Sequence, residues 1–214
     1  MSKPRPTIVV ATGNAHKVVE IAAALGSAGD SPLAGVTFVA VHDRCPDFVD
    51  PVEDGATFED NAAIKARAAH DATGLPALAD DSGLVVDALD GAPGVHSARY
   101  SGEPCDDARN NARLLSELAH TPAGERRARF VSCLVLVGLD ALLPDQPPYV
   151  SVTGTCEGRI AAQPRGDNGF GYDPLFLPDA AAGRSMAELS LQEKTAISHR
   201  GAALRKLIET LRAG

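Results

Sequence analysis

Two adjacent carboxylates, Asp80 and Asp81, interrupt an otherwise apolar part of this chain. The apolar residues 75–79 lead into them, and Ser82, Gly83 and a second apolar run follow. Adjacent residues of a β-strand point to opposite faces, so both carboxylates cannot face one ligand from a regular strand end. We therefore expect one to point into a site and the other to brace a turn or a neighbouring group.

Paired acids at the edge of a buried strand suit a hard cation such as Mg2+, which takes oxygen ligands and is often bound together with phosphates. The alternative is an Asx-rich turn between two hairpin strands, in which aspartate and glycine serve only the turn. This stretch alone does not separate the two interpretations, and the rest of the chain has to decide between them.

The composition is that of a soluble globular protein with room for a large core. The chain has 214 residues, of which 44% are apolar and 22% charged, enough for one domain of two lobes around a cleft. The net charge of −8 argues against a nucleic-acid-binding surface and against an anionic membrane partner. An anionic substrate would need a local cluster of lysines and arginines.

The spacing of the cysteines and the length of the apolar runs bear on the cellular compartment in which the protein is expected. Cys45, Cys105, Cys133 and Cys156 lie far apart without a CxxC pair, which fits neither a zinc site nor a disulfide framework. No segment approaches the roughly 20 apolar residues that span a bilayer, and the first apolar run is too short for a signal peptide. A reducing cytoplasm fits these observations.

Residues 7–12 form a short β-branched run that predicts a buried strand. Gly13 and Asn14 break it, and apolar residues at helical spacing follow up to Leu25. A strand, a tight polar turn and a helix start direct backbone N–H groups at a bound phosphate. Thr12, Asn14 and Lys17 add side-chain donors. The alternative is a plain strand–helix connection in which Asn14 caps the helix.

A second strand is predicted at residues 36–41, followed by a loop at 42–56 that carries Glu53 and Asp54. Thr57 then opens a helix, because Asp60 three residues later completes a capping box. Lys65 lies one turn after Asn61, so both can face the same side. Without a fold to place it, we expect Lys65 to be a solvated surface lysine.

The middle of the chain mixes strands and helices without a domain boundary. A long loop is predicted at residues 91–102, with Arg99 as a phosphate or carboxylate partner. A helix follows at 106–118, and two long strands at 128–139 and 149–156 are expected to pair. Helices distributed between strands require that part of the sheet be parallel.

Glycines flank a lone aromatic residue at positions 168–174. Such a loop lets the backbone approach a flat ligand closely, and Phe170 or Tyr172 could stack on a base. The alternative is a glycine turn pinned by an aromatic residue of the core.

The last segment begins with a capping box at residues 190–193. Apolar residues at helical spacing follow up to Leu211, which predicts a final helix that packs on the core. Lys194, His199 and Arg200 gather at its start, where the helix dipole favours anions rather than cations. A bound polyanion would explain this arrangement. The alternative is a set of surface cations without a partner.

These segments together describe a site for a nucleoside triphosphate with Mg2+. At this point the chain closely resembles the Ham1/RdgB family of inosine triphosphate pyrophosphatases over nearly its whole length. The resemblance rests on ordered motifs at residues 12–17, 57–62 with 65–66, 79–84, 94–100, 170–174, and 193–194 with 197–200.

The resemblance implies an α/β fold, in which residues 1–214 form a single domain with an elongated mixed sheet, flanking helices and two lobes around a central substrate cleft. It also implies a homodimer. The implied activity is hydrolysis of ITP, dITP and XTP between the α and β phosphates, which would remove deaminated purines from the nucleotide pool.

The resemblance also assigns residues. Asp81 would be the base and would bind Mg2+ together with Glu53, a choice made over the neighbouring Asp54. Phe170 would stack on the purine, and His199 and Arg200 would lie near its 6-oxo edge. The implied substrate-binding residues are Thr12, Gly13, Asn14, Ala15, His16, Lys17, Ser82, Phe170, Gly171, Tyr172, Asp173, Lys194, His199 and Arg200.

Three other functions compete with this one. The first is a Maf-like pyrophosphatase of modified pyrimidine triphosphates. The His199-Arg200 pair and the Phe170 loop argue against it. A nucleotide-binding regulator without turnover would not need Asp81 in a carboxylate pair. A nucleic-acid-binding module is the least compatible, given the charge of −8 and the absence of a basic stripe.

Overall fold

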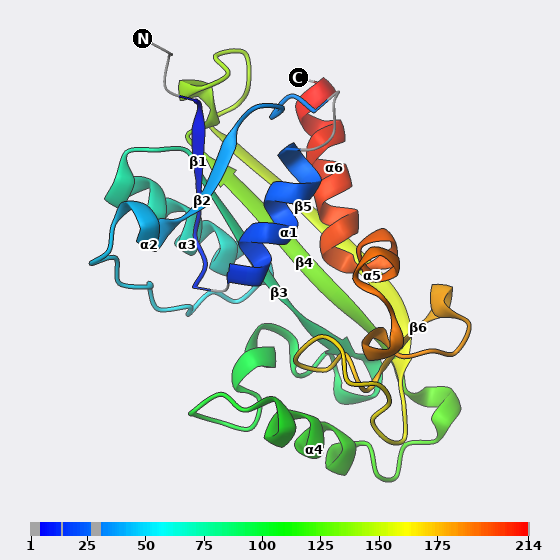
Figure 1. The fold of residues 1–214 in the computed structure, drawn as a ribbon. Coiled ribbons are helices and arrows are strands. Elements are labelled where there is room, and N and C mark those ends of the chain that lie inside the picture. The colour runs from blue at the N-terminus through cyan, green and yellow to red at the C-terminus, as the bar shows by residue number, and fades with distance from the viewer. Residues whose placement is uncertain (1–4, 14, 27–30, 214) are drawn as a thin grey trace. The chain divides into compact units, whose positions relative to one another are not determined.

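The computed structural model describes residues 5–13, 15–26 and 31–213 (Figure 1). The strands are β1 Thr7–Val10, β2 Thr37–Ala40, β3 Ala77–Val86, β4 Arg127–Val137, β5 Tyr149–Ile160 and β6 Phe176–Pro178. The α-helices are α1 Ala15–Gly26, α2 Val41–Arg44, α3 Phe58–Thr73, α4 Asp107–Glu117, α5 Leu191–Ile197 and α6 His199–Ala213. Short 3-10 helices are η1 Asp87–Leu89, η2 Gly94–Arg99, η3 Ala123–Glu125, η4 Leu139–Ala141, η5 Asp179–Ala181 and η6 Met186–Glu188.

Within the described residues the strands form one six-stranded sheet in the order β2-β1-β3-β4-β5-β6. Strand β1 is parallel to β2 and to β3, with Val9 opposite Ala77, whereas β5 and β6 are antiparallel. Parallel neighbours require crossover connections, and the segments containing α1 and α3 supply them. The chain therefore has the mixed α/β sheet with flanking helices that the sequence predicts.

The chain divides into two compact units. Unit 1 contains residues 1–81, 133–153 and 203–214, and unit 2 contains residues 82–132 and 154–202. Strands β3, β4 and β5 and helix α6 each continue from one unit into the other. Asp81 is the last residue of unit 1 in this strand, and Ser82 is the first of unit 2.

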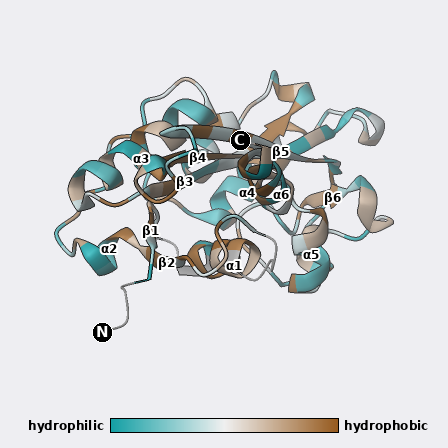
Figure 2. Cartoon of the chain, turned by 90° about the horizontal axis from the view of Figure 1, so that it is seen from above, coloured by the Kyte–Doolittle hydropathy of each residue, from teal (hydrophilic) through white to brown (hydrophobic). Residues whose placement is uncertain are grey.

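Unit 1 has an apolar layer on each face of its sheet. Ile8 and Val10 of β1 pack with residues of α1 and α6, such as Ile21 and Leu207. The intervening Val9 packs instead with alanines of α3 in a separate cluster. This alternation places α1 and α3 on opposite faces of the strands, and Figure 2 shows them there.

Unit 2 has its own core. Phe130 and Phe176 have ring centroids 4.6 Å apart, and both lie in a buried cluster with Leu84, Leu114 and Leu118. Leu114 lies in α4 and Leu118 is its C-cap one turn later, so this end of the helix presents an apolar side to the cluster. The predicted helix at residues 106–118 is confirmed, with Asp106 as its N-cap.

Several predicted boundaries change in the structure. Val41 begins α2 instead of ending β2, and residues 91–102 contain η2 where a loop was expected. The predicted final helix is two helices, because Ser198 adopts an extended conformation between α5 and α6. Among the described residues, no helix is both long enough and apolar enough to cross a membrane.

The predicted capping box at the start of α3 is present. The Thr57 side chain accepts a hydrogen bond from the Asp60 N–H, and Asp60 accepts one from the Thr57 N–H. We expect Thr57→Ala to lower the free energy of unfolding by about 1 kcal/mol, because the helix loses a cap. Urea denaturation measures this loss. Thr57→Ser keeps the hydroxyl and should stay within about 0.5 kcal/mol of the original; an equal loss in both variants would contradict the capping role.

Candidate functional site

Strand β3 runs without interruption through both carboxylates. Asp80 and Asp81 lie in the middle of Ala77–Val86 rather than at a strand end, so the expected strand end and the alternative hairpin turn are both wrong. The apolar neighbours show which face each occupies: Leu78 packs with the α1 and α6 layer, whereas Ala79 packs with α3. By alternation Asp80 belongs to the first face and Asp81 to the second.

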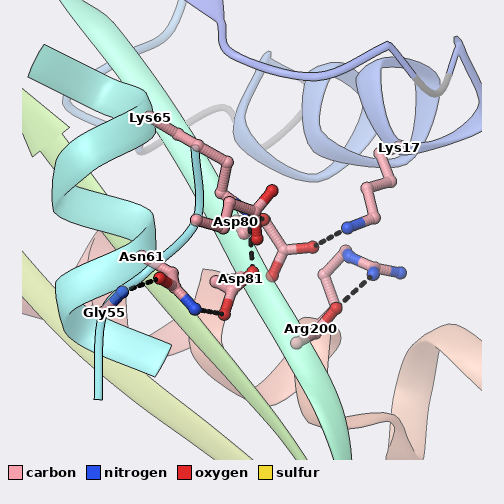
Figure 3. Close-up of polar contacts among 9 residues, drawn as sticks. Lys17, Gly55, Asn61, Lys65, Asp80, Asp81 and Arg200 are labelled. Carbon is pink, nitrogen blue, oxygen red and sulfur yellow. Dashed lines mark hydrogen bonds and ion pairs between the residues drawn. The ribbon is translucent and has the colours of Figure 1, made fainter. Parts of the chain in front are cut away.

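Asp80 is held by the helix that follows β1. Its Oδ2 lies 3.0 Å from Lys17 Nζ in the first turn of α1, and the Asp80 side chain is 1% exposed. A buried carboxylate requires such a partner, because desolvation disfavours its charge. Asp80 is therefore the bracing residue of the predicted pair, and it fixes the position of Lys17 (Figure 3).

Asp81 lies against the other helix. Its Oδ1 is 2.6 Å from Lys65 Nζ, and Glu53 Oε2 is 3.4 Å from the same nitrogen. The Lys65 ammonium also donates to the Asp80 carbonyl oxygen at 3.2 Å. The Lys65 side chain is 13% exposed, so the prediction of a solvated surface lysine is wrong. The strand places a buried acid next to α3, which only the tertiary arrangement reveals.

Burial and charge act on this cluster in opposite directions. Burial raises the pKa of the Asp81 carboxyl above its ordinary value, and the Lys65 ammonium offsets part of that rise. Burial alone would lower the pKa of Lys65, but the attraction of Asp81, Glu53 and Asp80 outweighs it, so the net pKa lies above the ordinary 10.5. Lys65 is therefore a cation at neutral pH, and its stabilising contribution is lost as pH rises through that raised pKa.

Asn61 connects the Glu53 loop to Asp81. It is completely buried, its Oδ1 accepts the Gly55 N–H at 2.8 Å, and its Nδ2 donates to Asp81 Oδ2 at 3.5 Å (Figure 3). A Cβ on Gly55 would lie 2.6 Å from Asn61 Oδ1, so the loop approaches this closely because residue 55 is glycine. The motif that places Asn61 one turn before Lys65 was the available sequence signal for both residues.

The donor set of this cluster suits a divalent cation that is shared with a substrate. In the residues that the structure describes, no group of three or more histidine, cysteine or acidic side chains forms a metal site. Asp81 and Glu53 nevertheless both contact one ammonium, so their oxygens converge on a single cation. Mg2+ commonly takes one or two protein carboxylates and completes its shell with water and phosphates. Glu53 is the acid that shares the Lys65 ammonium with Asp81.

The predicted phosphate-binding turn is described in part. Thr12 and Gly13 lie between the end of β1 at Val10 and the start of α1 at Ala15, as the pattern of the sequence predicts. Asn14 and the side chains of Ala15 and His16 lie outside the described residues. Lys17 extends from the first turn of α1 to Asp80.

In unit 2, Ser82 meets the start of α6. Arg200 Nη2 donates to Ser82 Oγ at 3.4 Å, and Arg200 is 4% exposed. The ring of His199 stacks on Phe130, with centroids 4.9 Å apart and planes 18° apart. Both side chains are therefore buried in unit 2, and the alternative of surface cations is wrong for them. Ser82 follows Asp81 directly in β3.

The glycine loop presents one exposed aromatic ring. Phe170 is 47% exposed, and Lys194 Nζ lies 5.0 Å from its ring centroid. Asp173 Oδ2 accepts the Phe170 N–H at 3.0 Å and a Lys194 N–H at 2.6 Å. A Cβ on Gly169, whose φ is +85°, would lie 2.1 Å from that oxygen. The loop therefore wraps around a buried carboxylate and leaves the Phe170 ring outside.

Tyr172 has a different position from Phe170. Its side chain is 5% exposed and belongs to the core cluster of unit 2. Its hydroxyl donates to the Ser97 carbonyl oxygen at 2.8 Å, and burial raises the pKa of the Tyr172 phenol, which stays protonated. Of the two aromatic residues that the sequence offered for stacking, Phe170 has the accessible ring. Tyr172 is the core aromatic that pins the loop.

The sequence matches one protein family. The sequence model of the Ham1 family covers residues 8–210. A dITP/XTP pyrophosphatase of Mycolicibacterium paratuberculosis is 50% identical over 204 residues, which are 95% of each chain. A dITP/XTP pyrophosphatase of Geobacter sulfurreducens is 50% identical over 204 residues, which are 95% of this chain and 96% of that protein.

Solved structures agree with the fold. A HAM1 protein from Coxiella burnetii superposes with a TM-score of 0.83 at 40% identity, covering 98% of this chain and all of the other. A nucleoside-triphosphatase, or dITP/XTP pyrophosphatase, from Mycobacterium abscessus gives a TM-score of 0.73 at 46% identity, covering 94% of this chain and 98% of that one.

Lys65 is expected to hold this cluster together. Lys65→Met removes the cation between buried carboxylates and should lower the free energy of unfolding by about 3 kcal/mol. Mg2+ should recover part of the loss, because a divalent cation can replace the ammonium. Urea denaturation with and without Mg2+ measures both effects. The control is Lys206→Met, which removes an exposed ammonium that donates to Thr153 and should cost less than about 1 kcal/mol. Equal losses in both variants would contradict this role.

Proposed function

This chain belongs to the Ham1 family, and we propose that it hydrolyses the non-canonical purine triphosphates ITP, dITP and XTP to the monophosphate and pyrophosphate. The observation that carries this proposal is the buried cluster in which Asp81 and Glu53 contact one ammonium, within a fold whose relatives are named dITP/XTP pyrophosphatases. The activity would remove deaminated purines from the nucleotide pool.

Asp81 and Glu53 are the residues that would hold Mg2+. When bound, this ion would supply charge neutralisation for the phosphates and orientation of the reacting groups. Asp81 would in addition orient a water molecule for attack at the α phosphate and accept its proton. Lys65 keeps the Asp81 carboxylate in one position at 2.6 Å, and such fixed geometry is a large part of catalytic advantage.

The triphosphate would be bound by the turn at residues 12–17. Backbone N–H groups at a helix start favour anions, and Lys17 adds a positive charge. The ion pair with Asp80 at 3.0 Å supports this role, because it holds the ammonium in the first turn of α1. Lysines stabilise charge that develops on a transferred phosphoryl group.

The base would be bound by residues of unit 2. The exposed ring of Phe170 would stack on the purine, with the backbone of Gly171, Tyr172 and Asp173 beside it. Ser82, Lys194, His199 and Arg200 would contact the nucleotide, the last two near its 6-oxo group. A 6-oxo group accepts hydrogen bonds where adenine offers an amino donor, so a site lined with donors leaves ATP mispaired.

We also infer a homodimer in the cytoplasm. The homodimer rests on the family resemblance. The location is supported by the cysteines, all of which are free thiols, as is usual in a reducing compartment.

Substrate choice and the metal carboxylates are tested together. We expect Mg2+-dependent pyrophosphate release from ITP and XTP, with little from ATP, GTP or dTTP. Asp81→Asn and Glu53→Gln should each reduce the rate by roughly a hundredfold or more, because they remove a proton acceptor or a metal ligand. The matched control is Asp54→Asn, an exposed acid adjacent to Glu53, which should leave the rate unchanged.

Other outcomes of the same assay favour other functions. A preference for dTTP would favour a Maf-like pyrophosphatase. Binding of ITP without release of pyrophosphate would indicate a regulator. A loss of activity in Asp54→Asn but not in Glu53→Gln would assign the second metal-binding carboxylate to Asp54 instead of Glu53.

Stacking by Phe170 is tested separately. Phe170→Leu keeps an apolar side chain but removes the flat ring, and should raise the KM for ITP by roughly tenfold, since stacking on one base contributes about 1–3 kcal/mol. Phe170→Tyr keeps the ring and should stay near the original KM. Steady-state kinetics measure both. Equal KM values in Phe170→Leu and the unmodified protein would exclude stacking on this residue.

A further inference from the structure

Helix α4 contacts the glycine loop of residues 168–174 at Gly171, the residue that follows Phe170. Asp107 Oδ2 accepts the Gly171 N–H at 2.7 Å, and Asn111 Nδ2 donates to the Gly171 carbonyl oxygen at 2.8 Å. Asp107 and Asn111 are one turn apart, so both side chains leave the same side of α4. The two polar groups of a single glycine are thus held from one helix.

The other side of the loop is fixed at the same time. Asp173 accepts the Phe170 N–H at 3.0 Å and pairs with Lys194 at 2.6 Å. The Phe170 N–H and both polar groups of Gly171 are therefore hydrogen-bonded, while the Phe170 side chain itself stays 47% exposed. Because these bonds hold the backbone beside the ring, the loop has little backbone freedom left to lose when a flat ligand stacks on Phe170.

Asp107 and Asn111 have no role in the site described above. They lie in a helix more than fifty residues before the glycine loop, and neither belongs to the motifs on which the family resemblance rests. Their neighbours in α4 serve other purposes: Asp106 caps the helix and Leu114 packs in the core. The contacts of Asp107 and Asn111 with Gly171 thus have no explanation in the helix itself.

We propose that Asp107 and Asn111 are positioning residues for base recognition, which hold the Phe170 ring in the orientation that a purine requires. The proposal rests on the proposed function, because it assumes that a purine nucleotide stacks on Phe170. It goes beyond that function by assigning a part in base recognition to helix α4 through its contacts with Gly171. Removing either contact frees the loop without touching the triphosphate-binding residues.

The experiment measures binding of two ligands by calorimetry in the presence of Mg2+. Inosine monophosphate contains the base, and pyrophosphate does not. Asn111→Ala should weaken binding of inosine monophosphate by about fivefold, the usual value of one hydrogen bond, and should leave pyrophosphate binding unchanged. In kinetics the KM for ITP should rise while kcat stays within about twofold.

Two further variants control for the helix. Ser116→Ala changes an exposed residue of α4 that is outside the contact and should have no effect on either ligand. Asp107→Asn keeps an oxygen that can accept the Gly171 N–H, so it should retain most of the affinity for inosine monophosphate. Asp107→Ala removes that oxygen and should weaken binding of inosine monophosphate. Thermal unfolding of each variant separates loss of binding from loss of the folded protein.

A double-mutant cycle with Phe170 decides whether the effect passes through the ring. In a Phe170→Ala background, Asn111→Ala should have no additional effect on binding of inosine monophosphate, because no ring remains to be positioned. The inference is overturned if the effects are independent, if Asn111→Ala weakens pyrophosphate equally, or if it leaves inosine monophosphate binding unchanged. If the unmodified protein neither binds inosine monophosphate nor hydrolyses ITP, the proposed function and the inference both fail.

Discussion

The arrangement of unit 1 depends on two charges that are buried in the middle of a strand. Asp80 and Asp81 are 2% and 7% exposed, and each would be strongly destabilising without a cation. Because the strand alternates, the two carboxylates need partners on opposite faces. Lys17 of α1 supplies one and Lys65 of α3 supplies the other. The same pair of residues therefore ties both helices to β3, in addition to the apolar packing on each face.

This arrangement also prepares the site for a charged ligand. The ammonium of Lys65 contacts Asp81 and Glu53, so it holds the two carboxylates close together. Asn61 holds the loop that carries Glu53 through the Gly55 N–H. Preorganised groups of this kind lose little freedom when the ligand binds. Unit 2 is also preorganised around Phe170. Asp173 and residues of α4 hold the backbone of the loop and leave the Phe170 ring accessible.

The elements of the fold were largely predictable, because their signals are local. The capping boxes at Thr57 and Ser190 are both present, and the β-branched run after residue 6 forms β1. The positions that differ depend on tertiary contacts. Residues 80 and 81 have the composition of a turn, yet they continue a strand because lysines from two helices neutralise them. Lys65 has the sequence context of a surface residue, yet β3 places an acid beside it.

The sequence by itself determined the residue types of the site, the order of the motifs and the family, since these depend only on chemistry and spacing along the chain. Only the tertiary structure decided which groups meet: Lys65 with Asp81 and Glu53, Asp173 with Phe170 and Lys194, and Gly171 with Asp107 and Asn111. Pairs separated by many residues carry no periodic signal in a single sequence. They form because the strand alternates and the helices pack on fixed faces, and burial then requires every charge to find a partner.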